Sequence, residues 1–194
     1  MKIFAIGLIG AMFLAPPQTF APDTDGFIRN WLILAPIVFE VSGAEAIEHR
    51  ILDDEAATKP KPGDSVVIIN TPLTWKAHQA SDYFVDFLQA FPQPGEQVAA
   101  YAVAYVTADA EMQVTLALGT NDQGKAWLNG KEVFKFTETR VLEKDANRVP
   151  VTLLKGQNVL VLKVVNEVNN WQACARFLKD GQPVTGLRIA TAPQ

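Results

Sequence analysis

The sequence predicts an all-β protein, an antiparallel β-sandwich with a short helical or irregular insertion near residues 40–65. Short segments rich in β-branched and aromatic residues recur in its second half, and turn residues separate them about every 8 to 12 positions. One of these turns, Asn129-Gly130, is a strong hairpin signal because a type I′ turn requires positive φ at both central residues. Regular short strands with almost no helix are typical of a sandwich or a barrel.

The strands of the second half are the best defined. Met112–Leu118 alternates between apolar and polar residues, which is the pattern of a strand with one buried face. Val159–Val165 is apolar on both faces apart from Lys163, as expected for a central strand. The predicted strands of this half are 98–108, 112–118, 125–128, 131–136, 149–154, 159–165, 171–178 and 184–189.

The first half is less regular. Phe27–Phe39 is expected to form a first strand that Pro36 breaks. Residues 40–65 are acidic and rich in alanine, and Ala44–Leu52 is expected to form one or two helical turns before a Pro/Gly cluster ends them. Two further short strands are expected at 66–69 and 73–77, and residues 78–97 are expected to be irregular.

The N-terminus has the pattern of a secretory signal peptide over residues 1–21. Lys2 supplies the positive charge, Ile3–Ala15 is a nearly unbroken apolar run, and Thr19-Phe20-Ala21 offers a cleavage site. The run is shorter than the about 20 residues that a membrane-spanning helix needs, and the alternative is an uncleaved anchor. We therefore expect a secreted or periplasmic protein with one domain over residues 22–194 and no membrane association after cleavage.

The composition argues against a nucleic-acid partner and against an internal disulfide bond. The formal net charge is −4 with acidic and basic residues interspersed, so no basic stripe is present for a nucleic acid to follow. Cys174 is the only cysteine, so the fold has no internal disulfide and depends on its core. We interpret Cys174 as a small buried apolar residue, with a reactive thiol as the alternative.

The run Gly119–Val133, GTNDQGKAWLNGKEV, resembles the turn and hairpin of galactose-binding-like jelly-roll domains, whose pattern is roughly G-x-D-D-G-x-x-V-W-L-N-G-K-x-V. Further stretches resemble exported bacterial members of this family in the same order along the chain. These stretches are Phe27–Ile37, Gly43–Ala46, Ala100–Ala102, Leu153–Leu160, and Asn169-Asn170-Trp171 with Arg176-Phe177. The sequence departs from the pattern at Ala35, Ile37, Asn121, Gln157 and Asn169-Asn170.

This resemblance covers residues 26–190, and it implies both a fold and a class of function. The fold is a galactose-binding-like jelly roll, which also forms carbohydrate-binding modules and the sugar-binding domain of family-2 glycoside hydrolases. The function that the resemblance implies is that of an exported, non-catalytic module that binds a glycan or serves polysaccharide-degrading enzymes. Because one fold hosts many functions, this last step is an analogy.

Two tryptophans are the first candidates for ligand contact. Trp75 and Trp171 lie next to irregular polar sequence, where an exposed ring could stack on a sugar. Side-chain amides that can bond hydroxyl groups in both senses surround the second of them, namely Asn166, Asn169, Asn170 and Gln172. The alternative for Trp171 is that it closes one end of the core. Trp31 and Trp127 are assigned to the core.

The loop Asn121-Asp122-Gln123-Gly124 has two interpretations. It is either a turn, in which Asn and Asp cap their own backbone, or a polar loop that contacts a ligand or a cation, and we favour the turn. Calcium takes about six to eight oxygen ligands, which Asn121 and Asp122 do not supply without distant loops. We therefore expect no cofactor and no metal site.

The sequence lacks the visible parts of a catalytic site. His49 and His78 have no metal-ligand spacing, and no G-x-S-x-G motif is present. The acids Asp53-Asp54-Glu55 are interpreted as a solvated loop. The first hypothesis is thus a carbohydrate-binding module. The alternatives are a structural or protein-interaction sandwich of the cell envelope, favoured if Trp75 and Trp171 are buried, and a small hydrolase with convergent carboxylates.

Overall fold

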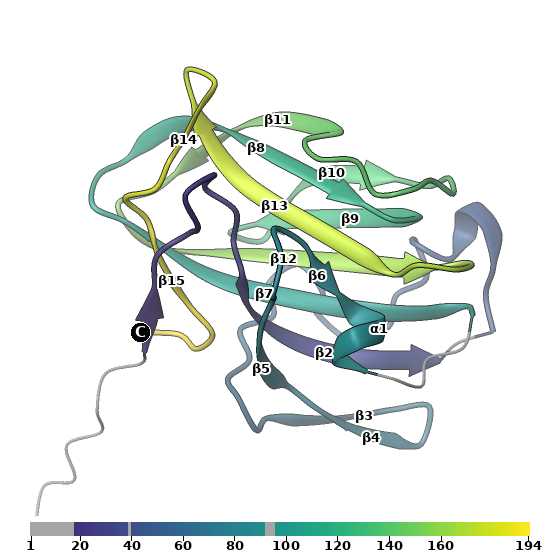
Figure 1. Cartoon of the computed structure of the whole chain (residues 1–194). Helices are drawn as coiled ribbons and strands as arrows, with labels where there is room; N and C mark the ends of the chain where they lie inside the picture. Colours follow the sequence, from purple (N-terminus) through teal and green to yellow (C-terminus); the bar gives the residue numbers. More distant parts are fainter. Residues whose placement is uncertain (1–17, 39, 92–95) are drawn as a thin grey trace, which may run out of the picture.

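The structure, a computed structural model, describes residues 18–38, 40–91 and 96–194. It contains short and long antiparallel strands, one 3₁₀ turn (η1) and one short helix (α1) over these residues (Figure 1). Their bounds are β1 Thr19–Phe20, β2 Asn30–Val38, η1 Gly43–Glu45, β3 Ser65–Ile68, β4 Thr71–Thr74, β5 Lys76–Gln79, β6 Val85–Asp86, α1 Phe87–Ala90, β7 Val98–Ala108, β8 Met112–Thr120, β9 Gln123–Leu128, β10 Lys131–Phe136, β11 Asn147–Leu153, β12 Gly156–Asn166, β13 Gln172–Lys179, β14 Gln182–Pro183 and β15 Arg188–Ala190.

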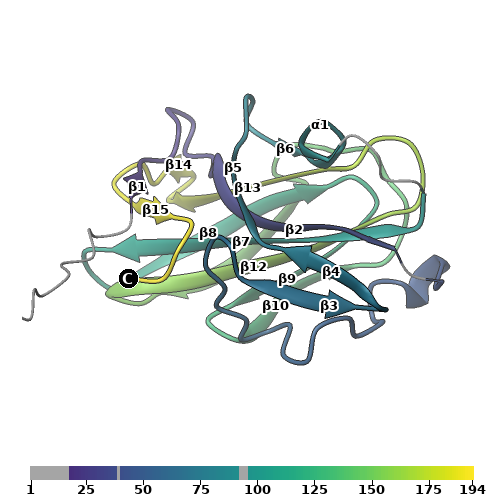
Figure 2. The same ribbon diagram turned by 90° about the horizontal axis from the view of Figure 1, so that it is seen from below.

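The strands form the predicted antiparallel β-sandwich. The larger sheet has eight strands in the order β1-β15-β7-β12-β9-β10, with β2 paired to β7 and β5 paired to β2. The smaller sheet has five strands in the order β11-β8-β13-β14, with β6 paired to β13. A separate two-stranded hairpin, β3-β4, lies beside the larger sheet on the side away from the smaller one (Figure 2).

Most predicted strands are confirmed, and the clearest is the hairpin. Asn129 and Gly130 join β9 to β10 with φ of 53° and 81°, as a type I′ turn requires. The predicted break at Pro36 is wrong, because β2 continues to Val38. Its pairing with β7 shifts register between Leu34 and Ile37, so the sheet accommodates a residue that has no N–H to donate.

The segment expected to be irregular, 78–97, contains a short strand and a helix. Asp86 begins α1, and its carboxylate accepts hydrogen bonds from the backbone N–H groups of Leu88 (3.0 Å) and Gln89 (3.2 Å). This is an N-cap, in which a side-chain oxygen satisfies N–H groups that have no partner within the helix. Such a short helix has no periodicity for a sequence pattern to reveal.

The predicted signal peptide falls largely on residues 1–17, which lie outside the described residues. Within the rest of it, Thr19–Phe20 forms β1 and pairs with Ala190 and Ile189 of β15. Cleavage after Ala21 would therefore remove a strand from one edge of the larger sheet. The helices of the described residues include none that is long and apolar enough to cross a membrane.

The central strands of the larger sheet are buried on both faces, which explains their apolar character. The inner face of this sheet, with Ala100, Ala102 and Ala104 of β7, packs in one cluster with aromatic residues from both sheets, including Trp31 and Phe177. Its outer face forms a second cluster from β2, β7, β9 and β12 together with residues of the 40–64 segment. Because the central strands β7 and β12 have no solvated face, they do not alternate between apolar and polar residues.

Residues 40–64, called the strap from here on, cover part of this outer face. Ala46, Ile47 and Leu52 of the strap are buried against the sheet. Figure 2 shows the strap on the same side of the larger sheet as β3 and β4. Of the helical turns predicted for this segment, only η1 and a few turns are formed. Apolar contact with the sheet holds the segment, rather than helical hydrogen bonds.

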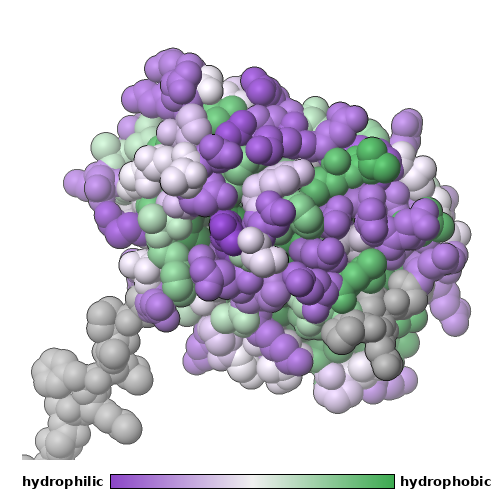
Figure 3. Space-filling view, in the orientation of Figure 1, coloured by the Kyte–Doolittle hydropathy of each residue, from purple (hydrophilic) through white to green (hydrophobic). Residues whose placement is uncertain are grey.

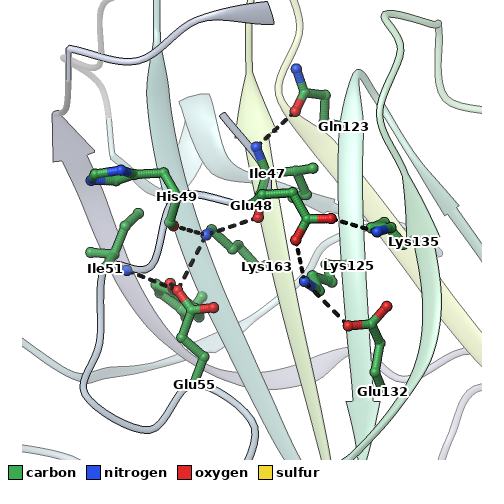
Figure 4. A network of polar contacts seen from close by, with 11 residues as sticks. Ile47, Glu48, His49, Ile51, Glu55, Gln123, Lys125, Glu132, Lys135 and Lys163 are labelled. Carbon is green, nitrogen blue, oxygen red and sulfur yellow. Dashed lines mark hydrogen bonds and ion pairs between the residues drawn. The ribbon is translucent and has the colours of Figure 1, made fainter. Parts of the chain in front are cut away.

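Lys163 of β12 links the strap to the larger sheet (Figure 4). Its side chain is fully buried, and its ammonium donates hydrogen bonds to the carbonyls of Ile47 (3.1 Å) and His49 and to Glu55 Oε1 (3.2 Å). Tyr101 of β7 donates its hydroxyl proton to the same carboxylate. Burial lowers the pKa of Lys163 and raises that of Tyr101, so these contacts replace hydration that both groups have lost.

Lys163 belongs to a row of three lysines. Register places it opposite Lys125 of β9, which in turn lies opposite Lys135 of β10. Like charges directly opposite in a sheet are destabilising. Glu48 of the strap compensates by pairing with Lys125 (2.7 Å) and Lys135, and these two ammonium groups lower its pKa to about 2.

The stability of the chain is expected to fall by about 1 kcal/mol between pH 5 and pH 2 through Glu48 alone. A carboxylate whose pKa drops on folding stabilises the folded state above its ordinary pKa of 4.5 and loses that contribution as pH falls towards 2. The expected loss is small because 45% of the Glu48 side chain is exposed and solvent screens the pairs.

Denaturant unfolding of wild type and Glu48→Gln at neutral and acidic pH measures this contribution. Glu45→Gln serves as a matched control, since Glu45 is exposed and forms no recorded ion pair. An equal loss of stability with acid in wild type and Glu48→Gln would show that the pairing with the lysine row does not stabilise the fold.

Candidate functional site

Trp75 and Trp171, the two candidates for stacking on a ligand, are both buried, so neither can stack on a sugar, and Trp171 takes its alternative role in the core. Trp171 has no exposed surface, donates its indole N–H to the Val164 carbonyl (3.2 Å) and packs against Phe87 with ring centroids 5.0 Å apart. Trp75 is 4% exposed and lies in the outer cluster. Neither ring offers a face to a sugar.

Trp75 is buried because its ring lies in the outer apolar cluster, with residues of β2, β7 and β12. Its backbone N–H donates to the Asp64 carbonyl (2.9 Å), and its carbonyl accepts from the Gly63 N–H (3.0 Å), so the end of the strap is held beside it. The polar residues next to Trp75 in the sequence indicated that its ring would be exposed, whereas tertiary packing buries it.

Four of the other predicted residues do come together, at one end of the sandwich. Asn121 and Asp122 in the turn between β8 and β9 and Asn169 and Asn170 in the loop between β12 and β13 line one open cleft of about 550 Å³. These connections lie at the same end of the ribbon (Figure 1). The remaining residues of the cleft are Thr139, Arg140, Val141 and Val168. Gln172, the other predicted contact, lies outside it and approaches Asp86 instead (3.5 Å).

Asp122 holds the three segments of the cleft together. One carboxylate oxygen accepts hydrogen bonds from the backbone N–H groups of Glu167 (2.8 Å) and Val168 (3.1 Å), and the other accepts from the Arg140 N–H (3.3 Å). Its own N–H donates to the Arg140 carbonyl (2.8 Å), and its φ is 56°. Asp122 is 3% exposed. The turn interpretation is confirmed, and the turn also positions the neighbouring loops.

Arg140 is the charged group of the cleft that sequence reasoning missed. Its Nε donates to the Thr120 carbonyl (3.0 Å), one terminal nitrogen donates to Thr120 Oγ1 (2.9 Å), and its guanidinium lies 3.8 Å from the centroid of the Phe136 ring. Among the described residues no carboxylate lies at ion-pair distance from it. Partial burial lowers its pKa. Its place in the long connection between β10 and β11 carries no motif that could have identified it.

That connection, residues 137–146, packs directly on the smaller sheet. A Cβ atom on Gly119 of β8 would lie 2.1 Å from the Glu143 carbonyl oxygen, so only glycine allows this approach. Asp145 anchors the far end by accepting from Arg176 Nε (2.9 Å) and from Arg148 (3.3 Å). Arg140 is therefore presented from a segment that is held at both ends.

The polar groups of the cleft are suited to hydrogen bonding with hydroxyl groups. Asn121 is 4% exposed, and its Oδ1 has no hydrogen-bond partner among the described residues. Asn169 and Asn170 are exposed, and Asn169 has a φ of 62°. Amides donate and accept, and the guanidinium donates only, so together they match a ligand with several oxygen atoms.

Asp122 is the one carboxylate among the described residues that line the cleft. It already accepts three backbone hydrogen bonds. Over the residues that the structure describes, no three His, Cys, Asp or Glu side chains converge in a way that could hold a metal ion.

Other sequence assignments have clear outcomes. Trp31 and Trp127 are core residues, as predicted, and Cys174 is buried at 1% exposure with a pKa that burial raises to about 11. The thiol is therefore in its unreactive protonated form near neutral pH. The expected solvated loop at 53–55 is wrong for Glu55, which accepts from Lys163, Tyr101 and the Ile51 N–H (2.9 Å).

Comparisons with known proteins give similarities of fold. No protein-family model and no curated protein sequence matches the chain. Among solved structures, a β-glucuronidase of Faecalibacterium prausnitzii is 17% identical with a TM-score of 0.47, over 80% of this chain and 23% of that one. A family 35 carbohydrate-binding module from an environmental isolate is 12% identical with a TM-score of 0.37, over 91% of this chain and 99% of that one.

A third similar structure is a glycosyl hydrolase family 2 member of Bacteroides cellulosilyticus DSM 14838, which is 10% identical with a TM-score of 0.40. It matches over 82% of this chain, and the chain spans only 20% of its length. At such identities the similarity concerns the fold alone.

Proposed function

We propose that this chain is a non-catalytic binding module that takes a saccharide in the cleft lined by Asn121, Arg140, Asn169 and Asn170. The observation that carries this proposal is that three amides and an arginine converge on loops from distant parts of the chain, and that the arginine has no ion-pair partner among the described residues. Binding sites of this kind place a few polar groups on a rigid scaffold.

The chemistry of the cleft favours a hydroxylated ligand over an apolar one. Each sugar hydroxyl both donates and accepts, which the amides of Asn121, Asn169 and Asn170 can match. The buried, unpartnered Oδ1 of Asn121 costs stability unless it accepts a hydrogen bond, and a ligand hydroxyl would supply one. Because no aromatic ring lines the cleft in the described structure, specificity would come from hydrogen bonds rather than from stacking.

The proposal also includes that the module does not catalyse a reaction and that the chain is exported. The engagement of Asp122 with three backbone N–H groups supports a structural role for the one carboxylate in the cleft. The signal-like pattern of residues 1–21 supports a secreted or periplasmic location, where glycans are available.

A second candidate is a protein-interaction sandwich of the cell envelope. The burial of Trp75 and Trp171 favours it, since the aromatic platform on which the sugar-binding hypothesis first depended does not exist. The two candidates differ in whether the polar cleft or another surface is used, so a substitution in the cleft separates them.

Arg140→Ala is expected to weaken saccharide binding by at least tenfold, because it removes charge-assisted hydrogen bonds worth roughly 1.5–3 kcal/mol. Screening the purified chain against neutral and acidic polysaccharides by affinity electrophoresis identifies a ligand, and calorimetry with an oligosaccharide then compares the variants. Asn169→Ala is a second cleft variant, at an exposed position.

Lys179→Ala is the matched control, since Lys179 is exposed at the end of β13 away from the cleft. It should leave binding unchanged. Retention of no polysaccharide by the wild-type chain would refute the saccharide proposal. Equal binding by wild type and Arg140→Ala would place the site elsewhere.

A further inference from the structure

A second cavity lies on the opposite side of the larger sheet from the smaller one, and it is apolar. It encloses about 550 Å³ between the end of β2 (Pro36, Ile37 and Val38), the β3-β4 hairpin (Ile68, Ile69, Thr71 and Leu73) and the strap (Glu40, Val41 and His49). This size is within the usual range of about 300–1,000 Å³ for small-molecule sites. Figure 3 views the molecule from the face of the smaller sheet, and the face shown is mostly hydrophilic with scattered apolar residues.

Two large aliphatic side chains from different elements line this cavity while remaining open to solvent. Val38 of β2 is 67% exposed, and Ile69 of the hairpin turn is 66% exposed. The walls also contain the half-buried Val41 and Leu73. Isolated exposed aliphatic residues are common in proteins, but here they converge on one concave surface.

The backbone at Ile69 makes this convergence unusual. Ile69 and Asn70 form the turn between β3 and β4 with φ of 46° and 63°. Asn tolerates this left-handed conformation, whereas it is strained for a β-branched residue. Neither the turn nor burial in the core explains an isoleucine there, because Asn, Asp or Gly would relieve the strain and solvent reaches the side chain. Strain of this kind is retained where the side chain has another role.

We propose that this cavity binds the aliphatic chain of a small amphiphile, with Ile69 and Val38 closing on the chain from two sides. Most of the side chains that line the cavity are aliphatic, and the imidazole of His49 is the one aromatic ring among the described lining residues, which suits a flexible alkyl chain better than a planar ring system. The titratable side chains among the described residues that line the cavity are Glu40 and His49, and both are exposed. The one carboxylate, that of Glu40, favours a ligand head that is uncharged or cationic. This inference is independent of the saccharide proposal.

Calorimetry with the full chain and a set of straight-chain probes tests the ligand class. We expect saturable 1:1 binding of n-octanol and n-octylamine and weaker binding of octanoate, whose carboxylate Glu40 repels. Affinity should rise about fourfold for each added methylene, the value for a buried CH₂ group, until the cavity is full. No binding of any of these probes at millimolar concentration would overturn the proposal, as would tighter binding of octanoate.

Ile69→Asn separates a ligand-binding role from a structural one. Asn accommodates the positive φ, so the variant should melt at an equal or higher temperature than wild type while its octylamine affinity falls at least fivefold. Val67→Asn is the matched control, because Val67 is also exposed on this hairpin and does not line the cavity. Its affinity should be that of wild type. A lower melting temperature for Ile69→Asn with unchanged octylamine affinity would show that Ile69 serves the fold and would overturn the proposal.

Discussion

Replacing Lys163 with alanine is expected to destabilise the folded chain by about 3–5 kcal/mol, a large part of the total for one domain. The ammonium is fully buried and is shared by two strap carbonyls and Glu55. Its removal leaves a largely buried carboxylate without its cation and two carbonyls without this donor, and it opens a cavity beside Tyr101. Urea denaturation measures the loss. Faster trypsin cleavage after Arg50, an exposed strap residue, would show that the loss of stability affects the strap.

Two further variants separate charge from packing. Lys163→Met keeps most of the apolar volume and removes the charge, so it should recover only a small part of the loss. Adding Glu55→Gln to Lys163→Met should restore about 2 kcal/mol, because the carboxylate that lost its cation is then neutral. Lys179→Ala, at an exposed position, should change stability by no more than about 0.5 kcal/mol. If Lys163→Met were as stable as wild type, the strap would be held by apolar contact alone.

Substituting Asp122 is expected to have the second largest effect, and it acts on both stability and binding. Asp122→Ala removes the acceptor of three backbone N–H groups in a position that is 3% exposed, which should cost about 3–4 kcal/mol. Since these bonds join residues 137–146 to the loop after β12, saccharide binding should also be lost. Unfolding in urea and calorimetry with the saccharide measure the two effects.

Asp122→Asn tests which segment the carboxylate positions. An asparagine oxygen can still accept from Glu167 and Val168, while its NH₂ group would face the Arg140 N–H, where two donors repel. We expect a loss of stability of about 1–2 kcal/mol and weakened binding, with Arg140 displaced. Normal binding by a stable Asp122→Asn variant would mean that the position of Arg140 does not depend on this contact.

These two residues show how the same fold carries two different kinds of polar contact. Lys163 and Glu55 join the strap to the face of a sheet, where the surrounding side chains are apolar and the contact is closed to ligands. Asp122 joins loops at the rim, where the neighbouring Asn169 and Asn170 stay exposed. Only the second arrangement leaves polar groups available to a hydroxylated ligand.

Sequence reasoning succeeded where the signal is local. The period-2 pattern of Met112–Leu118 and the turn at Asn129-Gly130 depend on neighbouring residues, and both are confirmed. Lys163 stood out in the sequence as the one polar residue of an apolar strand, but its partners lie more than a hundred residues away in the strap. No local pattern could name them.

The candidate site was found only in part for the same reason. Asn121, Asp122, Asn169 and Asn170 follow from turn and amide patterns, and they do meet in the cleft. Arg140 lies in a connection without a motif, and it reaches the cleft because Gly119 lets residues 137–146 pack on β8.

The sequence by itself determined the class of fold, most strand positions, the hairpin and the burial of both faces of the central strands, because periodicity and turn chemistry act over a few residues. The tertiary structure decided that Trp75 and Trp171 are buried and that Arg140 joins the amides. It also decided that the strap covers the row of lysines and that Ile69 faces an apolar cavity. Each of these depends on which distant segments pack together, and that is set by the burial of apolar surface over the whole chain.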